Sequence, residues 1–254
     1  MKLKVLGSAG AEFPKFNPPA FLIDSSILLD AGTIGAVLDE QAQWKIRHIL
    51  ITHAHLDHIR GIPFLADNII VKNKKHSVSV SGIQPVLRII KENLLNDAVW
   101  PDFTVIPAPN NAVLRLNPVE EGVPFKVNSY TVTAYMVNHA VPASGFVIES
   151  KRGRRLLYTG DTGPTDRIWK EAERLLHCAI VEVSFPNGME RMALMTGHLT
   201  AKLLSGELKK MRLIPERILI THPKPQYLSR IKKEVAALGL GNVRILRDGE
   251  VYEV

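Results

Sequence analysis

The chain has 254 residues, 46% of them hydrophobic, enough for a substantial core, and we predict a single domain over residues 1–254. Lys and Arg number 32 against 25 acidic residues, a net charge of +7 that fits an anionic substrate or nucleic acid but also scattered solvated turns. The only cysteine, Cys178, excludes a disulfide framework and a thiolate metal cluster. No apolar run is long enough for a membrane span or signal peptide, so we expect a cytoplasmic protein without a membrane partner.

The N-terminal third predicts strands and helices in alternation. Three apolar runs have the length of strands, and they occupy residues 3–5, 20–23 and 27–30. The expected helices occupy residues 33–44 and 86–95. A short buried strand is predicted at residues 48–51, and beyond Gly61 we expect a helix and then a strand by Val71. The segment Gly7-Ser8-Ala9-Gly10 lacks the lysine of a phosphate-binding loop, so we predict an ordinary loop near a site.

Four side chains that commonly bind metals follow the strand at residues 48–51, in the segment His53-Ala54-His55-Leu56-Asp57-His58. His53 and His55 are two residues apart, so on an extended segment they point the same way and can bind one cation. Asp57 and His58 fall where a helix should begin, which directs them at a second cation. Two cations about 3.5–4 Å apart activate a shared hydroxide, so the pattern predicts a hydrolytic centre. Histidines that only form structural hydrogen bonds are the alternative, and they fit so dense a pattern poorly.

Two isolated histidines also come directly after predicted strands. Residues 130–137 predict a half-buried strand, and His139 behind it can become the third ligand of the first cation. Residues 217–222 repeat the strand-then-Thr-His pattern of residues 49–53. That repetition makes His222 a candidate ligand.

A carboxylate follows a third strand. Residues 145–149 and 155–158 predict a hairpin, and its second strand leads into a glycine-bounded turn that contains Asp161. From such a turn a carboxylate can reach inward and bridge two cations. The proline that follows the turn opens a predicted helix over residues 164–176.

Glu182 and His198 form a second candidate group. Glu182 is an acid inside the apolar strand predicted at residues 179–183, and a buried acid needs a partner. We suggest His198, which precedes a helix predicted over residues 203–211, whose first N–H groups are then available to an anion. The Glu182 carboxylate raises the pKa of such a histidine, which can then protonate a leaving oxygen. A capping or packing histidine is the alternative for His198.

The remaining elements are a helix over residues 228–238 and a closing hairpin formed by residues 243–246 and 251–254. Three methionines lie between the Glu182 and His198 segments, and we expect core packing for them rather than a nucleobase pocket: Met189, Met192 and Met195. Three histidines without companions are expected to be structural: His48, His76 and His177.

These motifs resemble the metallo-β-lactamase superfamily, and the resemblance spans nearly the whole chain. It implies an α/β fold, a four-layer αββα sandwich with a two-metal site at one edge. The implied ligands of one metal are His53, His55 and His139, those of the other are Asp57, His58 and His222, and Asp161 bridges the two. The implied cofactors are two divalent ions, zinc first, with manganese or iron as alternatives because His/Asp sites accept each according to supply.

Two motifs indicate which branch of the superfamily the chain resembles most. Glu182-Val183-Ser184-Phe185 and His198-Leu199-Thr200-Ala201 resemble the Glu and His motifs of the phosphodiesterase branch, which includes ribonuclease Z and class II 3′,5′-cyclic-nucleotide phosphodiesterases. Within that branch, three segments are similar to the class II cyclic-nucleotide enzymes: residues 55–61, 160–164 and 183–187. Ala201 departs from those enzymes, which tend to have proline there, whereas ribonuclease Z tends to have alanine. We see no long glycine- and proline-rich insertion of the kind that binds tRNA in many ribonuclease Z enzymes.

The resemblance implies hydrolysis of a small anionic phosphodiester. The first choice of substrate is a 3′,5′-cyclic nucleotide, which is hydrolysed to the 5′-monophosphate. A bridging hydroxide held by Asp57 and the metals attacks phosphorus, and His198 with Glu182 protonates the leaving 3′ oxygen. The alternative is a ribonuclease Z-like tRNA 3′-processing endonuclease, and a third hypothesis is a metal-stabilised binding protein without turnover. Thioester or lactam hydrolysis leaves Glu182 and His198 without a role. Proteins of this kind are often homodimers, so the resemblance also implies a homodimer.

Overall fold

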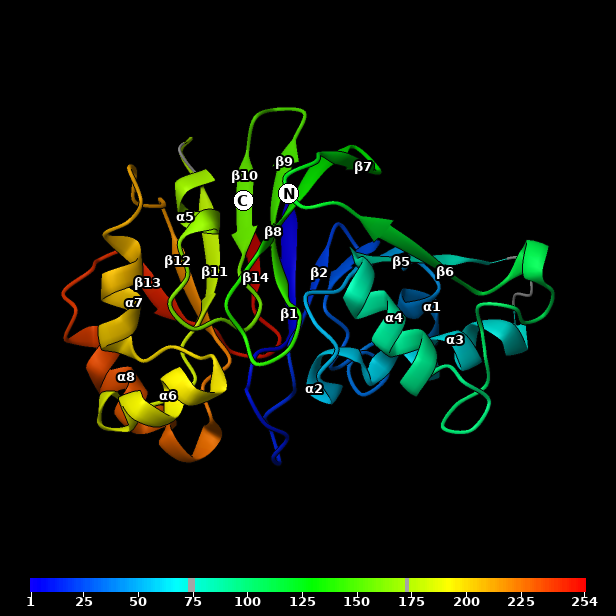
Figure 1. The fold of residues 1–254 in the computed structure, drawn as a ribbon, viewed down its shortest axis with the longest axis horizontal. Helices are drawn as coiled ribbons and strands as arrows, with labels where there is room; N and C mark the ends of the chain where they lie inside the picture. Colours follow the sequence, from blue (N-terminus) through cyan, green and yellow to red (C-terminus); the bar gives the residue numbers. More distant parts are fainter. Residues whose placement is uncertain (73–75, 172–173) are drawn as a thin grey trace.

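The computed structural model describes residues 1–72, 76–171 and 174–254 as two mixed sheets that pack face to face, with helices on both outer sides (Figure 1). The first sheet has the order β14 (Val251–Glu253), β1 (Lys2–Gly7), β2 (Ala20–Ile23), β3 (Ile27–Leu29), β4 (His48–Leu50), β5 (Val78–Ile83) and β6 (Leu114–Val119). The second has the order β13 (Val243–Ile245), β12 (Ile218–Thr221), β11 (Cys178–Glu182), β10 (Arg155–Tyr158), β9 (Ser144–Ser150), β8 (Tyr130–Met136) and β7 (Phe125–Val127).

In the described part of the chain, helices flank both sheets, on opposite sides of the view in Figure 1. Beside the first sheet lie α1 (Glu40–Gln43), α2 (Leu56–Ile59), α3 (Gly61–Lys72) and α4 (Gln84–Asn93). Beside the second lie α5 (Arg167–Glu171), α6 (Glu190–Thr196), α7 (Ala201–Leu208) and α8 (Leu228–Ala236). Three short 3₁₀ turns complete the described elements: η1 (Pro109–Asn111), η2 (Asn187–Met189) and η3 (Pro225–Tyr227). No helix among the described residues is both long enough and apolar enough to span a membrane.

Three apolar layers hold the sheets and helices together. Along β4 and its exit, Ile49 and Ile51 pack toward the helices of the first sheet, whereas Leu50 packs between the two sheets. Successive side chains of a strand point to opposite faces, so a strand covered on both faces is apolar throughout. In the second sheet Leu157 and Tyr158 divide in the same way between its helices and the shared core. The predicted four-layer αββα sandwich is confirmed.

Parallel strand direction sets the position of the site. In the first sheet β3, β4, β5 and β6 are parallel, and in the second β10, β11, β12 and β13 are parallel. Because β9 is antiparallel to both β8 and β10, β8 also runs in the direction of β10. The carboxyl ends of these strands therefore lie at a common edge of each sheet, where polar side chains from separate segments can meet.

Most predicted strands are confirmed, and the errors have local causes. The helix expected over residues 33–44 is reduced to α1, because the Asp39 carboxylate caps its start by accepting a hydrogen bond from Ala42 N at 2.8 Å. The strand expected by Val71 is wrong, since α3 continues through it to Lys72. The buried residues of α3 include Ile62, Leu65, Ala66 and Ile69, which is helical spacing.

The helix expected over residues 164–176 is also shorter, because α5 ends at Glu171. Residues 172 and 173 of that prediction lie outside the described part of the chain, and Leu175 and Leu176 are not helical. The helix predicted over residues 86–95 is confirmed as α4, which buries Val86, Leu87 and Ile90.

The predicted closing hairpin is wrong. β13 pairs with β12 at the edge of the second sheet, while β14 pairs with β1 at the edge of the first. The turn between them crosses from one sheet to the other, and Asp248 in that turn accepts hydrogen bonds from Ser8 Oγ at 2.9 Å and Asn17 N at 3.0 Å. The expected core packing is wrong for Met192 and Met195, which are 43% and 70% exposed on α6, whereas Met189 is partly buried.

Candidate metal centre

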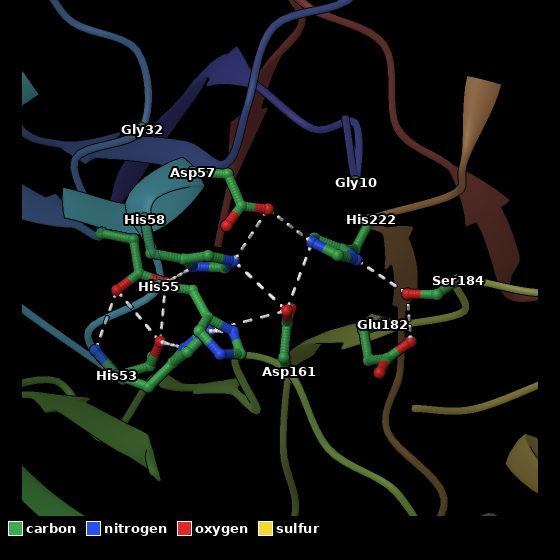
Figure 2. Close-up of polar contacts among 12 residues, drawn as sticks. Gly10, Gly32, His53, His55, Asp57, His58, Asp161, Glu182, Ser184 and His222 are labelled. Carbon is green, nitrogen blue, oxygen red and sulfur yellow. Dashed lines mark hydrogen bonds and ion pairs between the residues drawn. The ribbon is translucent and has the colours of Figure 1, made fainter. Parts of the chain in front are cut away.

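The common edge of the strands brings all seven predicted ligands together, and Figure 2 labels all of them except His139. Their ligand atoms form three overlapping groups, each with all atoms within 4.8 Å: His53, His55, His139 and Asp161; Asp57, His58 and His222; Asp161, His198 and His222. Five separate segments contribute, from the ends of β4, β8, β10, β12 and from α2. The sequence places these residues up to 169 positions apart, and only the fold makes them neighbours.

His53, His55 and His139 point three ring nitrogens at one spot. The Nδ1 of His55 lies 3.1 Å from the Nε2 of His53 and 3.1 Å from the Nε2 of His139. Burial, first of all, lowers the pKa of each of these three rings. The rings are thus held neutral, the form in which imidazole binds a cation.

The far nitrogens of two of these rings are fixed by the chain. His139 Nδ1 donates to the carbonyl oxygen of Gly197 at 2.8 Å. His53 Nδ1 lies 3.0 Å from Thr52 Oγ1, whose own hydrogen goes to Asp30 Oδ2 at 2.9 Å. Since Thr52 donates to Asp30, it accepts from His53, which leaves the lone pair of His53 Nε2 facing the site.

Asp57, His58 and His222 form the second group. Asp57 Oδ2 lies 3.3 Å from His222 Nε2 and 3.9 Å from His58 Nε2. Burial would raise the pKa of Asp57, but its hydrogen bond with His222 and the nearby histidine charges lower it well below its usual range. The Asp57 side chain is about one-third exposed, whereas His58 is fully buried, so Asp57 lies on the open side of the group.

Asp161 lies between the two groups. Its Oδ2 is 3.7 Å from His53 Nε2, 3.3 Å from His58 Nε2 and 3.2 Å from His222 Nε2. Gly160 makes this position possible, because its φ of +60° is left-handed and a Cβ there would lie 2.6 Å from Thr52 Cβ. The carboxylate is thus placed where it can bridge two cations.

Asp30 supports the cage through hydrogen bonds, a role that the sequence analysis does not predict. This fully buried carboxylate accepts hydrogen bonds from Thr52 N at 2.8 Å, His58 Nδ1 at 2.7 Å and Tyr158 OH at 2.6 Å. Burial and the Asp30 charge raise the pKa of Tyr158 well above its usual range, so the phenol remains a donor. Because His58 Nδ1 donates to Asp30, His58 Nε2 is the nitrogen left to bind a cation.

Glu182, Ser184 and His198 stand beside the second group. His198 Nδ1 donates to Glu182 Oε1 at 2.7 Å, and Ser184 Oγ donates to Glu182 Oε2 at 2.9 Å. Ser184 Oγ in turn accepts from His222 Nδ1 at 2.7 Å. One buried carboxylate therefore orients both His198 and His222.

The electrostatics of His198 match that pairing. Burial alone would lower the pKa of His198, but the charge of Glu182 and its hydrogen bond outweigh burial and raise it. The His198 ring stacks on the His222 ring with centroids 5.3 Å apart and meets the His139 ring at 5.1 Å. The expected anion site at the next helix start is less open, because Lys202 N donates to Asn187 Oδ1 and Leu203 N to Thr200 Oγ1.

His222 has an unusual backbone. Its φ of +64° is left-handed, a conformation that costs a side-chain-bearing residue about 1–3 kcal/mol. His222 N donates to Ser8 O at 2.6 Å, and Gly10 packs so closely that a Cβ there would lie 2.6 Å from His222 Nδ1. The loop at residues 7–10, expected near the site, holds this histidine in place.

The donor set fits divalent cations. In the described part of the chain, His58 Nε2 is buried and forms no hydrogen bond, although it faces Asp161 Oδ2 at 3.3 Å. Burial lowers the pKa of His58, but Asp161 and Asp30 outweigh it and raise the pKa well above its usual range. Negative charge that attracts a proton attracts a cation as well, and the two compete for Nε2. Imidazole and carboxylate ligands suit zinc, manganese and iron.

The histidines expected to be structural lie outside the cage. His48 Nε2 bonds Asn128 Oδ1 at 3.0 Å, His76 Nε2 bonds Ile46 O at 2.8 Å, and His177 Nδ1 accepts from Arg155 N at 3.0 Å. The lone thiol of Cys178 is buried in the core, which raises its pKa to about 12 and makes it inert.

Two facing mixed sheets, helices on both outer sides and a His/Asp cage at one edge define the metallo-β-lactamase fold. The family model described as a beta-lactamase superfamily domain matches residues 25–222. The chain therefore belongs to this superfamily and is a metal-dependent hydrolase, and the family implies divalent metal ions at the cage.

Relatives place the resemblance in the phosphodiesterase branch, as the motifs predict. The chain is 26% identical over 235 residues to a probable 3′,5′-cyclic-nucleotide phosphodiesterase of Yersinia pestis, covering 78% of this chain and 66% of that relative. It is 25% identical over 302 residues to a ribonuclease Z of Pyrococcus abyssi, covering 96% and 92%. Among solved structures, unliganded yeast PDE1 has a TM-score of 0.84 at 17% identity, with 98% of each chain covered.

Proposed function

We propose that the protein hydrolyses 3′,5′-cyclic nucleotides to 5′-monophosphates at a two-cation site. One observation carries this proposal: the His198–Glu182 pair, at 2.7 Å, stands directly against the cage of seven ligands. A phosphodiester needs a proton donor for its leaving oxygen in addition to positive charge at phosphorus. Similarity to the Yersinia pestis phosphodiesterase supports the same choice.

The cage offers two sets of ligands. The first cation would be held by His53, His55 and His139, the second by Asp57, His58 and His222, with Asp161 shared between them. When bound, two divalent cations lower the pKa of a water molecule and offset charge on phosphoryl oxygens. We expect zinc, with manganese or iron as alternatives.

The chain's own residues then have separate tasks. Asp57, on the open side of the second group, orients the attacking water and accepts its hydrogen bond. As the bond between phosphorus and the 3′ oxygen breaks, His198 gives its proton to that oxygen. Glu182 touches His198 rather than substrate, so it is a positioning residue that keeps the Nδ1 proton in place and leaves Nε2 toward the site.

The test is an assay of cyclic AMP, cyclic GMP and a precursor tRNA with metal-loaded protein. Asp57→Ala should lose cyclic-nucleotide hydrolysis by roughly three orders of magnitude or more, and His198→Ala by about 10²–10⁴-fold. The matched control is Asp67→Ala, an exposed acid on α3, which should keep full activity. Unchanged turnover by the Asp57 variant at equal metal content would refute the mechanism.

A second candidate is tRNA 3′-end cleavage. Similarity to the Pyrococcus abyssi ribonuclease Z extends over 96% of this chain, and the net charge of +7 suits a polyanion. Binding that neutralises several phosphates weakens steeply with salt, whereas binding of one cyclic nucleotide does not. A steep fall in precursor cleavage from 50 to 200 mM salt, with little cyclic-nucleotide turnover, would favour this candidate.

Three broader expectations remain part of the proposal: one domain over residues 1–254, a cytoplasmic location and a homodimer. The buried, inert Cys178 suits a reducing compartment. Light scattering on the purified protein measures the oligomeric state, and a monomer at working concentration would remove the homodimer.

A further inference from the structure

A cavity of about 410 Å³ lies at the end of α2, the helix that carries Asp57 and His58, and Arg60 at the C-cap of α2 lines it. It lies between the loop at residues 32–36 and the start of α3, and Glu12 of the N-terminal loop reaches it from across. Gly32 in the cavity wall packs against the backbone of α2, because a Cβ at Gly32 would lie 2.0 Å from the main-chain oxygen of Asp57, and Figure 2 shows Gly32 next to Asp57 and His58. Cavities that hold small molecules have about this volume.

One wall of the cavity is a face of α3. Gly61, Phe64 and Asn68 line it, and residues three or four apart share one side of a helix. The Phe64 ring is 55% exposed and stands edge-on to Trp100 with centroids 5.1 Å apart. An exposed aromatic side chain in the wall of a cavity offers a flat apolar surface to a ring of a bound molecule.

The opposite edge of the cavity is charged. Arg60 Nε donates to Gly32 O at 2.7 Å, which fixes the guanidinium beside the cage, and Arg60 also pairs with Glu12. Glu12 is 64% exposed and Arg60 28%, so both remain accessible. A guanidinium supplies donors and a carboxylate supplies acceptors, and the edge of a nucleobase carries both kinds of partner.

We propose that this cavity is the nucleobase subsite, with the base lying against Phe64 and its edge meeting Arg60 and Glu12. The inference rests on the proposed function, since it places the base once the phosphodiester sits at the cage. A cyclic nucleotide ties its phosphate to the sugar, so the base must lie one sugar ring from phosphorus. Gly32 in the cavity wall packs against the main-chain oxygen of Asp57, so the cavity lies on the Asp57 side of the cage.

The first test separates the base from the phosphodiester. Phe64→Ala should raise the KM for cyclic AMP and cyclic GMP about tenfold, as expected for losing one base–aromatic stack, and leave kcat nearly unchanged. The KM for abasic ribose 3′,5′-cyclic phosphate should stay the same. The matched control is Val71→Ala, 73% exposed at the far end of the same helix, which should change neither KM.

The second test reads binding without turnover. Because Trp100 contacts Phe64, its fluorescence should respond to 5′-AMP and 5′-GMP but not to ribose 5-phosphate. Phe64→Ala should abolish the response and weaken nucleotide binding about tenfold. Glu12→Gln keeps the shape of the side chain but removes its charge, so it should change the ratio of affinities for the two nucleotides.

The outcomes distinguish the subsite from the proposed function. If Phe64→Ala alters nucleotide and abasic substrates equally, or neither, the subsite is wrong even where cyclic nucleotides are hydrolysed. If no cyclic nucleotide is hydrolysed but nucleotides bind in a Phe64-dependent way, the subsite stands and the proposed reaction is wrong. If ribose 5-phosphate and 5′-AMP bind equally well to the native protein, the cavity holds no base.

Discussion

The sequence Ile-Thr-His occurs twice at the site, once after β4 as Ile51-Thr52-His53 and once at the end of β12 as Ile220-Thr221-His222. The first histidine lies directly behind a central strand of the first sheet, and the second behind a strand of the second sheet. The same three residues thus supply one candidate ligand from each half of the sandwich.

The two copies reach the cage in different ways. Thr52 Oγ1 links His53 to Asp30, so a carboxylate stabilises that ring through a hydroxyl. Thr221 Oγ1 only donates to Ser8 O at 3.2 Å, and His222 instead receives its support from Ser184, with its backbone at a φ of +64°. An identical local sequence therefore does not determine the support of the ligand.

What decides is the neighbouring strand. β3 pairs with β4, and Asp30 follows β3 directly, which puts a carboxylate next to Thr52. β11 pairs with β12 and continues to Glu182 and Ser184, which puts the serine behind His222. Both histidines are thus linked to a buried carboxylate through one hydroxyl: His53 through Thr52 to Asp30, and His222 through Ser184 to Glu182.

Asp30→Asn should break the first copy most severely. The amide keeps one acceptor oxygen for the hydrogen bonds that Thr52, His58 and Tyr158 donate to the carboxylate. We expect a loss of about 3 kcal/mol in the free energy of unfolding and about 100-fold weaker metal binding. Chemical denaturation and metal titration measure both, with the exposed Asp67→Asn as control. Native stability and affinity in the Asp30 variant would contradict the role of this carboxylate.

Ser184→Ala should break the second copy with a smaller effect. It removes the hydroxyl between Glu182 and His222 while His198 keeps its direct bond to Glu182. We expect roughly 30-fold weaker metal binding with little loss of fold stability, measured by titration of metal-free protein. Ser229→Ala, on the exposed side of α8, is the control. Equal affinities of the two variants would show that the serine does not support His222.

Thr52→Val and Thr221→Val compare the copies directly. Valine has nearly the shape of threonine but no hydroxyl, so each substitution removes the hydrogen bonds of that side chain. Thr52→Val should weaken metal binding about tenfold, because His53 loses its link to Asp30. Thr221→Val should change it less than about twofold, since His222 is supported elsewhere. Equal losses in the two variants would mean that the two copies are supported alike.

The part of the site that the sequence predicts lies in short segments of the chain. His53, His55, Asp57 and His58 sit together in the chain, and strand exits followed by His139, Asp161 and His222 are visible as apolar runs that end in a polar residue. The Glu182–His198 pairing followed from the rule that a buried acid needs a partner.

The supporting carboxylate Asp30 could not be predicted from a short segment. Asp30 closes a strand like many surface aspartates, and only the pairing of β3 with β4 puts it behind Thr52 and His58. The predicted closing hairpin is wrong for the same reason, because β13 and β14 are adjacent in sequence yet belong to different sheets. For Asp30, the available signal was a charged residue directly after an apolar run, which is the signal that drew attention to Asp161.

The most direct test is the number of metal ions that dialysed, metal-reconstituted protein retains, measured by elemental analysis beside His139→Ala and His222→Ala. The account predicts two ions per chain in the native protein and one in each variant, since each histidine belongs to a different half of the cage. Native protein that retains no ion, or variants that retain as many as the native chain, would contradict it.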